Sequence, residues 1–256
     1  MNESLFSPVD YCHTQNAHSL EGPRAALPQL LRGQVPRSLL DVGCGRGTWL
    51  KAAFGLGIQD IFGVDGVNIP ESELLISKSN FEQVNLEQEW GLGRRFEMAL
   101  CFEVAEHLSP NGASMLVRCL ARHADTIMFS AACPAQEGQH HINLQWPAYW
   151  QELFNREGYR CEDSLRWLIW LDDRIEPWYR QNLFLARRAL KDAGTEPRLL
   201  PVLHPSVLTN HSMLGMTEIR RNIIGQVSEG SEPAGWYLTQ PMQALSAKIF
   251  RYLGRK

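Results

Sequence analysis

The stretch RSLLDVGCGRGT, residues 37–48, predicts how the rest of this 256-residue chain folds. A short apolar run leads into three glycines at alternate positions, Gly43, Gly45 and Gly47, and a helical pattern follows from Thr48. Glycines at such a point let the main chain turn sharply from a strand into a helix, and they let a ligand approach the backbone closely. The stretch therefore predicts the first strand and the first helix of a ligand-binding α/β domain.

The acid at the end of this strand, Asp41, bears on which ligand binds there. Dinucleotide-binding turns have the pattern G-x-G-x-x-G, whereas this chain has G-x-G-x-G after an acid. A carboxylate would repel phosphates and would suit a cationic ligand. S-adenosylmethionine carries a sulfonium and an ammonium group, so the turn favours it. A nicotinamide cofactor remains the alternative, and competition between the two cofactors for binding would separate them.

Three further segments read as strands of the same domain. Ile58–Asp65 ends in an acid that follows Asp41 by 24 residues, which is where a βαβ unit places the acid that binds ribose hydroxyls. Phe81–Leu86 is a short third strand. Phe96–Glu103 is a fourth, and it runs directly into VAEHL. Strands alternating with helical patterns predict an α/β fold with a parallel sheet.

These motifs resemble those of the class I S-adenosylmethionine-dependent methyltransferases, which show D-x-G-C-G-x-G, an acid after strand two and E-V-x-E-H-L after strand four. The resemblance covers residues 39–186 and is specific for the cofactor, not for the methyl acceptor. It implies a Rossmann-like, doubly wound, seven-stranded sheet with strand seven antiparallel between strands five and six. The corresponding division is an N-terminal arm and helix at 1–36, a cofactor-binding domain at 37–187, and a helical C-terminal extension at 188–256.

The resemblance also implies which residues hold S-adenosylmethionine and its product S-adenosylhomocysteine. Asp41 would lie near the charged methionine end, and Asp65 would bind the ribose. Asn85 stands where many relatives carry Asp, so its amide oxygen would meet the adenine amino group without a charge-assisted bond. The complete set of expected cofactor-binding residues is Asp41, Gly43, Gly45, Gly47, Asp65, Gly66, Asn85, Leu86 and Cys101.

The loop after the fifth strand (125–132) is the second informative stretch. It leaves the strand at the carboxyl end, where open α/β sheets bind their ligands, and it reads QHHINLQWPAYW. It resembles a bacterial subgroup of these methyltransferases with the pattern G-H-x-N-x-Q-W-P-x-Y-W. Substrate contact and an ordinary polar surface are both open interpretations. The expected substrate residues are His140, Asn143, Trp146 and Tyr149.

Methyl transfer to a hydroxyl requires alignment of the acceptor and removal of one proton. His141 is the favoured general base because polar side chains surround it, and His107, four residues after Glu103, competes with it. Glu103 would lie beside the methionine end. No metal site is expected, since adjacent histidines such as His140 and His141 do not have the spacing of converging ligands.

Bulk properties restrict the class of protein. The net charge of −3 gives no footprint for nucleic acid. Six scattered cysteines without a C-x-x-C pair indicate reduced thiols, and no signal peptide or apolar span is apparent, so the cytoplasm is expected.

For each of two terminal segments, the sequence leaves more than one structural role open. The arm with Tyr11 and His13 either covers the cofactor or lies on the surface. The basic amphipathic run 240–256 packs on the domain, on a second subunit in a homodimer, or touches a membrane.

The favoured function is O-methylation of a small molecule, sugar or secondary metabolite, with a small-molecule acceptor as the partner. The alternatives are a cofactor-binding scaffold without catalysis and N-methylation of a small-molecule amine. Methylation of nucleic-acid amines is disfavoured because strand four ends in CFEVAEHL, where the exocyclic-amine enzymes carry a polar-Pro-Pro-aromatic run.

Overall fold

The computed structural model describes residues 19–136 and 138–207 of the chain. Tyr11, His13 and the predicted helix at 240–256 lie outside these residues. The chain groups into one compact unit of residues 1–204, which holds the sheet and its helices, and a second of residues 205–256.

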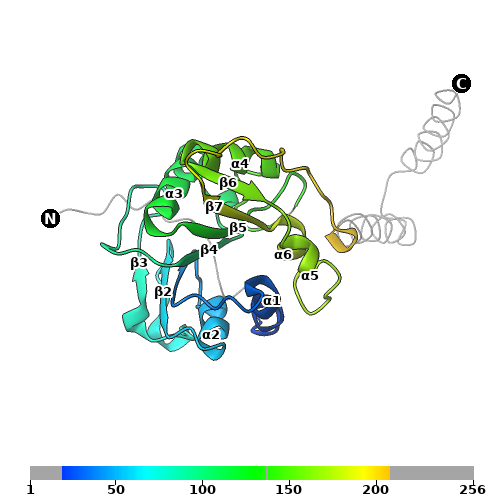
Figure 1. The fold of residues 1–256 in the computed structure, drawn as a ribbon. Coiled ribbons are helices and arrows are strands. Elements are labelled where there is room, and N and C mark those ends of the chain that lie inside the picture. Colours follow the sequence, from blue (N-terminus) through cyan, green and yellow to red (C-terminus); the bar gives the residue numbers. More distant parts are fainter. Residues whose placement is uncertain (1–18, 137, 208–256) are drawn as a thin grey trace, which may run out of the picture. The chain divides into compact units, whose positions relative to one another are not determined.

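A seven-stranded sheet forms the centre of this unit (Figure 1), in the order β3-β2-β1-β4-β5-β7-β6. β7 is antiparallel to both of its neighbours, and the other pairs are parallel. The predicted seven-stranded, doubly wound sheet with strand seven antiparallel is therefore confirmed. The strands are β1 (Ser38–Val42), β2 (Asp60–Asp65), β3 (Phe81–Gln83), β4 (Met98–Phe102), β5 (Thr126–Ser130), β6 (Tyr159–Glu162) and β7 (Phe184–Arg188).

The third helix begins at two residues that favour the start of a helix. Ser109 caps the third helix, with its Oγ accepting a hydrogen bond from the main-chain nitrogen of Gly112 at 3.1 Å, and Pro110 occupies the first turn. The helices are α1 (Glu21–Leu31), α2 (Thr48–Gly55), α3 (Pro110–His123), α4 (Pro147–Arg156), α5 (Arg166–Ile169) and α6 (Pro177–Asn182), and the 3-10 turns are η2 (Glu71–Glu73), η3 (Lys78–Asn80) and η4 (Ala105–His107).

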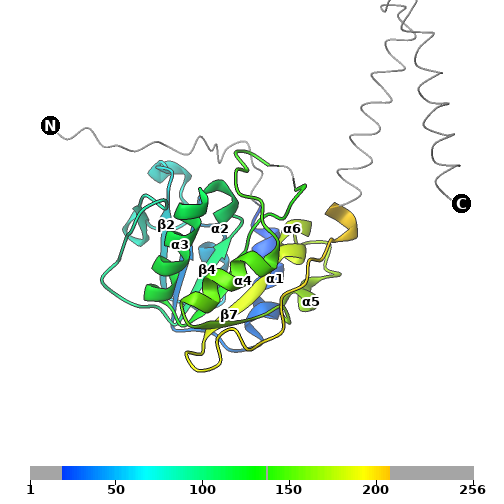
Figure 2. The ribbon, with the colours of Figure 1, turned by 90° about the horizontal axis from the view of Figure 1, so that it is seen from above.

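Helices cover both faces of the sheet. Successive strand residues point to opposite faces, so Leu40 of β1 joins the apolar layer under α3 and α4, and Leu39 joins the layer under α1, α2, α5 and α6. In Figures 1 and 2, α3 and α4 lie on one side of the sheet and α1 and α2 on the other. This three-layer arrangement leaves the carboxyl ends of the central parallel strands as the edge where loops meet.

The four strands that the sequence predicts by range, β2 to β5, are all shorter in the structure, and two of them end early for local reasons. β3 ends at Gln83, before Leu86, because the Asn85 side chain turns the chain by accepting a hydrogen bond from the Glu87 nitrogen at 3.0 Å. β4 ends at Phe102 because Glu103 adopts a left-handed conformation with φ +55°. Both endings place polar side chains at the carboxyl edge of the sheet.

The segment after β7 is anchored to α4 and β6 by one carboxylate. Oε1 of Glu196 accepts hydrogen bonds from Gln151 Nε2 at 3.1 Å, Asn155 Nδ2 at 2.7 Å and the main-chain nitrogen of Cys161 at 2.9 Å. Burial opposes the charged form of Glu196, but these donors outweigh it and lower its pKa to about 2. Residues beyond 187 thus stabilise the domain, and the exact boundaries at 36 and 187 stay predictions.

The structure also bears on the redox state of the cysteines and on whether a helix could span a membrane. The cysteines at 44, 101, 119, 133 and 161 are buried free thiols, so the described residues contain no disulfide between them. None of the described helices has the length and apolarity needed to cross a membrane.

Candidate functional site

The turn after β1 forms a tight cradle at the carboxyl edge of the sheet. Gly43 and Gly47 have φ values of +76° and +83°, which L side chains rarely adopt. A Cβ atom added at Gly43 would lie 2.2 Å from Cγ2 of Val104, and one at Gly47 would lie 3.0 Å from Cγ1 of Ile76. The glycines are therefore required both by backbone conformation and by close approach of other segments, the chain after β4 at Gly43 and the chain between η2 and η3 at Gly47.

Asp65, the acid at the end of β2, holds this turn in place. Its Oδ2 accepts a hydrogen bond from the main-chain nitrogen of Gly45 at 2.7 Å, and its Oδ1 accepts one from that of Val67 at 2.8 Å. The predicted ribose-binding acid is thus in direct contact with the predicted glycine turn and stabilises it.

Asp41 fits a cationic ligand. Its side chain is 2% exposed, and Oδ2 has no hydrogen-bond partner among the residues that the structure describes. Burial and the neighbouring charge of Asp65 raise the pKa of Asp41 to about 8. A ligand that carries positive charge would favour the ionised form, so this orphaned oxygen beside the glycine cradle suits the sulfonium and ammonium groups of S-adenosylmethionine.

The remaining expected cofactor residues have different surroundings. Asn85 uses Oδ1 to accept from Glu87, and Leu86 is buried with its side chain near Gly66, where an added Cβ would lie 3.8 Å from Leu86 Cδ1. Cys101 is fully buried in the apolar layer under α3, and burial raises the pKa of its thiol well above the usual range. Their contact with the cofactor stays a prediction.

Glu103 is held in a constrained conformation at the end of β4. A left-handed φ is uncommon for a residue other than glycine, and it persists where surrounding contacts fix it. Its Oε2 accepts from Gln136 Nε2 at 2.7 Å, and its Oε1 accepts from Asn182 Nδ2 at 3.1 Å. Burial raises the pKa of Glu103 even though these donors favour the charged form. The two amides fix the direction of the carboxylate.

A main-chain contact joins the loop after β5 to the turn after β4. The carbonyl oxygen of Glu106, in η4, accepts hydrogen bonds from the main-chain nitrogens of Ile142 and Asn143, both at 3.0 Å. This pairing brings His141 next to His107, and their ring centroids lie 5.1 Å apart. The two histidines that compete as general base therefore occupy one site.

Both histidines are held as neutral rings with the same tautomer. Nδ1 of His141 lies 2.9 Å from the main-chain oxygen of Gln136, and Nδ1 of His107 lies 3.3 Å from that of His140. A carbonyl oxygen only accepts, so each Nδ1 carries a hydrogen and the lone pair of a neutral ring is on Nε2; the main chain of Gln139 is a further hydrogen-bond partner of His107. Burial, and then the charge of His141, lower the pKa of His107 to about 4, and burial lowers the pKa of His141.

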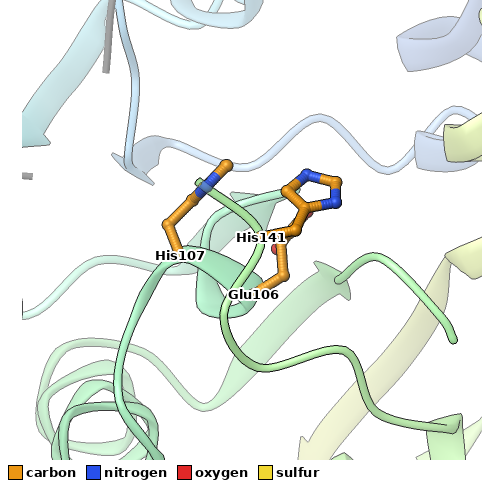
Figure 3. A group of neighbouring side chains, drawn as sticks. All are labelled: Glu106, His107 and His141. Carbon is orange, nitrogen blue, oxygen red and sulfur yellow. The ribbon is translucent and has the colours of Figure 1, made fainter. Parts of the chain in front are cut away.

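The side chain of Glu106 lies beside these rings (Figure 3) and is fully buried. Neither carboxylate oxygen has a hydrogen bond of good geometry within the described residues, although the carboxyl group of Glu103 and the main chain of Ala132 lie close enough to interact with it. Burial, and then the charge of Glu103, raise its pKa well above the usual range. Uncompensated burial of this kind is costly in a folded protein.

Three residues of this site are not singled out by sequence reasoning. Glu106 stands next to His107 in the quoted VAEHL run, so an adjacent acid and histidine in an apolar segment is a signal that was available. Gln136 and Asn182 have no such signal, because only the tertiary contacts with Glu103 reveal them.

Of the four expected substrate residues, one is buried near the histidines and the other three are partly or largely exposed. Asn143 is buried near the histidines, and its Nδ2 has no hydrogen-bond partner in the described part of the chain, while its Oδ1 accepts from Gln145. His140 is exposed with φ +51°, and Trp146 is 39% exposed just before α4. Tyr149 packs edge-on against Trp150, with ring centroids 4.9 Å apart. Of the expected substrate residues, Asn143 is the one whose main chain pairs with Glu106.

Comparisons with known proteins agree with this geometry. The model of a family described as "Methyltransferase domain" matches residues 16–171. DesVI of Streptomyces venezuelae has 18% identity and a TM-score of 0.52, over 66% of this chain and 93% of its own. The sugar N-methyltransferase KedS8 of Streptoalloteichus has the same identity and TM-score, over 69% of this chain and 90% of its own. No curated protein sequence matches the chain.

Proposed function

Since this chain belongs to the methyltransferase-domain family and uses S-adenosylmethionine, we propose that it methylates a hydroxyl group of a small molecule, with His141 as the proton acceptor. The observation that carries the proposal is the pair of neutral histidines at the carboxyl edge of the sheet, next to the glycine cradle. An amine attacks with its own lone pair, whereas a hydroxyl gains most from a base that removes its proton.

The residues around the cradle would hold the cofactor. Asp41 would face its positive charges, and Asp65 would accept from the ribose hydroxyls. The N-terminus of α2 begins at Thr48, so its main-chain N–H groups and dipole would favour the methionine carboxylate. When bound, S-adenosylmethionine supplies a methyl carbon whose bond to sulfur breaks with both electrons remaining on sulfur.

The residues around η4 would hold and activate the acceptor. The acceptor oxygen would form the new bond to carbon with one of its electron pairs while its proton passes to Nε2 of His141. The contact between Nδ1 of His141 and the Gln136 carbonyl supports this role, because it orients the ring and stabilises the imidazolium that forms. The unpartnered Nδ2 of Asn143 would donate to a second polar group of the acceptor.

His107 is the competing base. Its pKa of about 4 makes it a weaker proton acceptor than a histidine with a less depressed pKa. A general base works best when its pKa lies near the working pH. This difference favours His141 as the base and His107 as the neighbour that packs against it.

The function is tested with labelled S-adenosylmethionine and matched acceptors, such as an amino sugar and its hydroxy analogue. We expect label on the hydroxy compound. Label on the amine alone would replace the proposal by N-methylation, and saturable cofactor binding without label on any acceptor would support a scaffold without catalysis.

The base is tested with His141→Gln and His107→Gln in single-turnover experiments. We expect the chemical step of His141→Gln to slow by roughly 10²–10⁴-fold, while its affinity for S-adenosylhomocysteine stays the same. A larger loss in His107→Gln would transfer the role to His107. Rates within a few-fold of wild type in both variants would leave methyl transfer dependent on alignment alone.

A further inference from the structure

We propose that Glu106, His107 and His141 form a binding site for a divalent metal ion at the acceptor side of the methyl-transfer site. The three side chains come from η4 and from the loop after β5, and Figure 3 shows them gathered at one point. One ligand atom of each residue lies within 4.8 Å of the ligand atoms of the other two. Imidazole nitrogens and a carboxylate are ligands that first-row divalent ions such as Mn²⁺ and Zn²⁺ accept.

The histidines are already oriented as metal ligands. A metal-binding histidine usually donates its second ring N–H to a carbonyl or carboxylate, which fixes the tautomer. Nδ1 of His141 has this relationship with the Gln136 carbonyl at 2.9 Å, and Nδ1 of His107 has it with the His140 carbonyl at 3.3 Å. In both rings the coordinating lone pair is then on Nε2.

The buried carboxylate is the independent observation that points to an ion. Glu106 is 0% exposed, and neither of its oxygens has a hydrogen bond of good geometry among the described residues; its nearest polar neighbour is a second carboxyl group, that of Glu103, which does not compensate its charge. Folded proteins satisfy buried charged groups by pairing them or by binding them to metals. A cation between Glu106 and the two rings would compensate this carboxylate.

The present distances require a small closure. Around an ion with bonds of about 2.1 Å, neighbouring ligand atoms lie about 3–3.5 Å apart. The observed limit of 4.8 Å is wider than this by about 1.3–1.8 Å, so the side chains would have to move together by that amount when the ion binds. Three protein ligands leave coordination positions for water or for the acceptor. The earlier expectation of no metal rested on the adjacent pair His140 and His141, whereas this site uses His107 and Glu106 from another segment.

The consequence for catalysis rests on the hydroxyl methylation proposed above, and in the metal-bound protein solvent would replace His141 as the proton acceptor. An ion on Nε2 of His141 takes the lone pair that otherwise accepts the proton. A hydroxyl bound to the ion would instead lose its proton to solvent at a lower pH, because coordination lowers the pKa of bound water and hydroxyl groups.

Binding is measured on the full chain after chelator treatment, by titration with Mn²⁺ alone. Electron paramagnetic resonance reports the free ion, and calorimetry reports the stoichiometry. We expect one saturable site per chain, with affinity at least tenfold weaker in Glu106→Gln and in His141→Gln. The matched control is His140→Asn, which keeps the neighbouring main chain and tolerates a left-handed φ, and which should bind Mn²⁺ as the wild type does.

A further variant keeps all three ligands but obstructs one of them. A Cβ atom at Gly138 would lie 2.2 Å from Nε2 of His141, so Gly138→Ala should also weaken Mn²⁺ binding at least tenfold. Circular dichroism and affinity for S-adenosylhomocysteine should be unchanged in the variants, which shows that they are folded. Absence of saturable binding in the wild type, or equal affinity in folded Glu106→Gln and His141→Gln, would overturn the site. Because Mn²⁺ is titrated without cofactor or acceptor, failure of methyl transfer would leave this result intact.

Discussion

The main-chain nitrogen of Asn143 donates a hydrogen bond of 3.0 Å to the main-chain oxygen of Glu106. This contact joins the loop after β5 to the turn after β4, and it is the reason that His141 and His107 face each other. The glycine cradle approaches the same turn, since Val104 lies where a Cβ of Gly43 would be. The proposed cofactor and acceptor ends of the site are therefore connected through residues 103–107.

Gly43→Ala is expected to destabilise the protein by at least about 2 kcal/mol. A left-handed alanine costs about 1–2 kcal/mol, and the overlap with Val104 adds a packing cost of similar size. The control is Gly55→Ala at the end of α2, where an added Cβ meets nothing within 4 Å and φ is not positive. Chemical denaturation should show the control to be neutral or up to about 1 kcal/mol more stable. Equal stability of the two variants would contradict the requirement for glycine at position 43.

Asp65→Asn is expected to weaken binding of S-adenosylhomocysteine by roughly 1.5–3 kcal/mol, or about 10- to 150-fold. The substitution replaces one accepting oxygen by an NH2 group. This donor would face the main-chain N–H of Gly45 or Val67, and one acceptor for the ribose hydroxyls would be lost. Asp60→Asn is the control, because Asp60 starts the same strand and pairs with Arg94 on the surface. Calorimetry that finds the same affinity in both variants would remove Asp65 from the site.

Asp41→Asn is expected to change how stability of the cofactor-free protein depends on pH. The pKa of Asp41 is raised from 3.8 to about 8 on folding, so the native state holds a proton that the unfolded chain has lost between these values. Wild-type stability should therefore fall relative to Asp41→Asn as pH rises from about 4 to 8, by at most about 1.4 kcal/mol per pH unit. Denaturation curves at pH 5, 6.5 and 8 check this. A constant difference between the two proteins would exclude the shift.

Glu196→Ala is expected to destabilise the domain by about 1–3 kcal/mol, because Gln151, Asn155 and the Cys161 nitrogen lose a shared acceptor. The pKa of Glu196 is depressed to about 2, so its contribution is present above pH 4.5 and is lost as pH falls towards 2. Glu162→Ala, at an exposed position of β6, is the control. A loss no larger than that of the control would show that the segment after β7 is anchored by other contacts.

The sequence by itself determined the elements whose signals are local. Apolar strand segments that alternate with helical patterns, the glycines of the β1 turn and the acids at the ends of β1 and β2 predict a parallel α/β sheet, and the cap Ser109 with Pro110 is a local signal for the start of α3. The helix expected from Thr48 begins at that residue in the structure and ends at Gly55, because its sequence pattern and the glycine before it are sufficient. The position of the cofactor site follows, since parallel strands bring their carboxyl ends to one edge.

Tertiary structure alone decided how the acceptor side is assembled. His107 and His141 are far apart in the sequence, and their contact depends on the pairing of Glu106 with Ile142 and Asn143. The partners of Glu103, Gln136 and Asn182, come from two further segments. Such contacts depend on where loops cross after the sheet has formed. Protonation depends on the same packing, because burial sets the pKa values of Asp41, Glu106 and both histidines, and burial is a property of the folded chain.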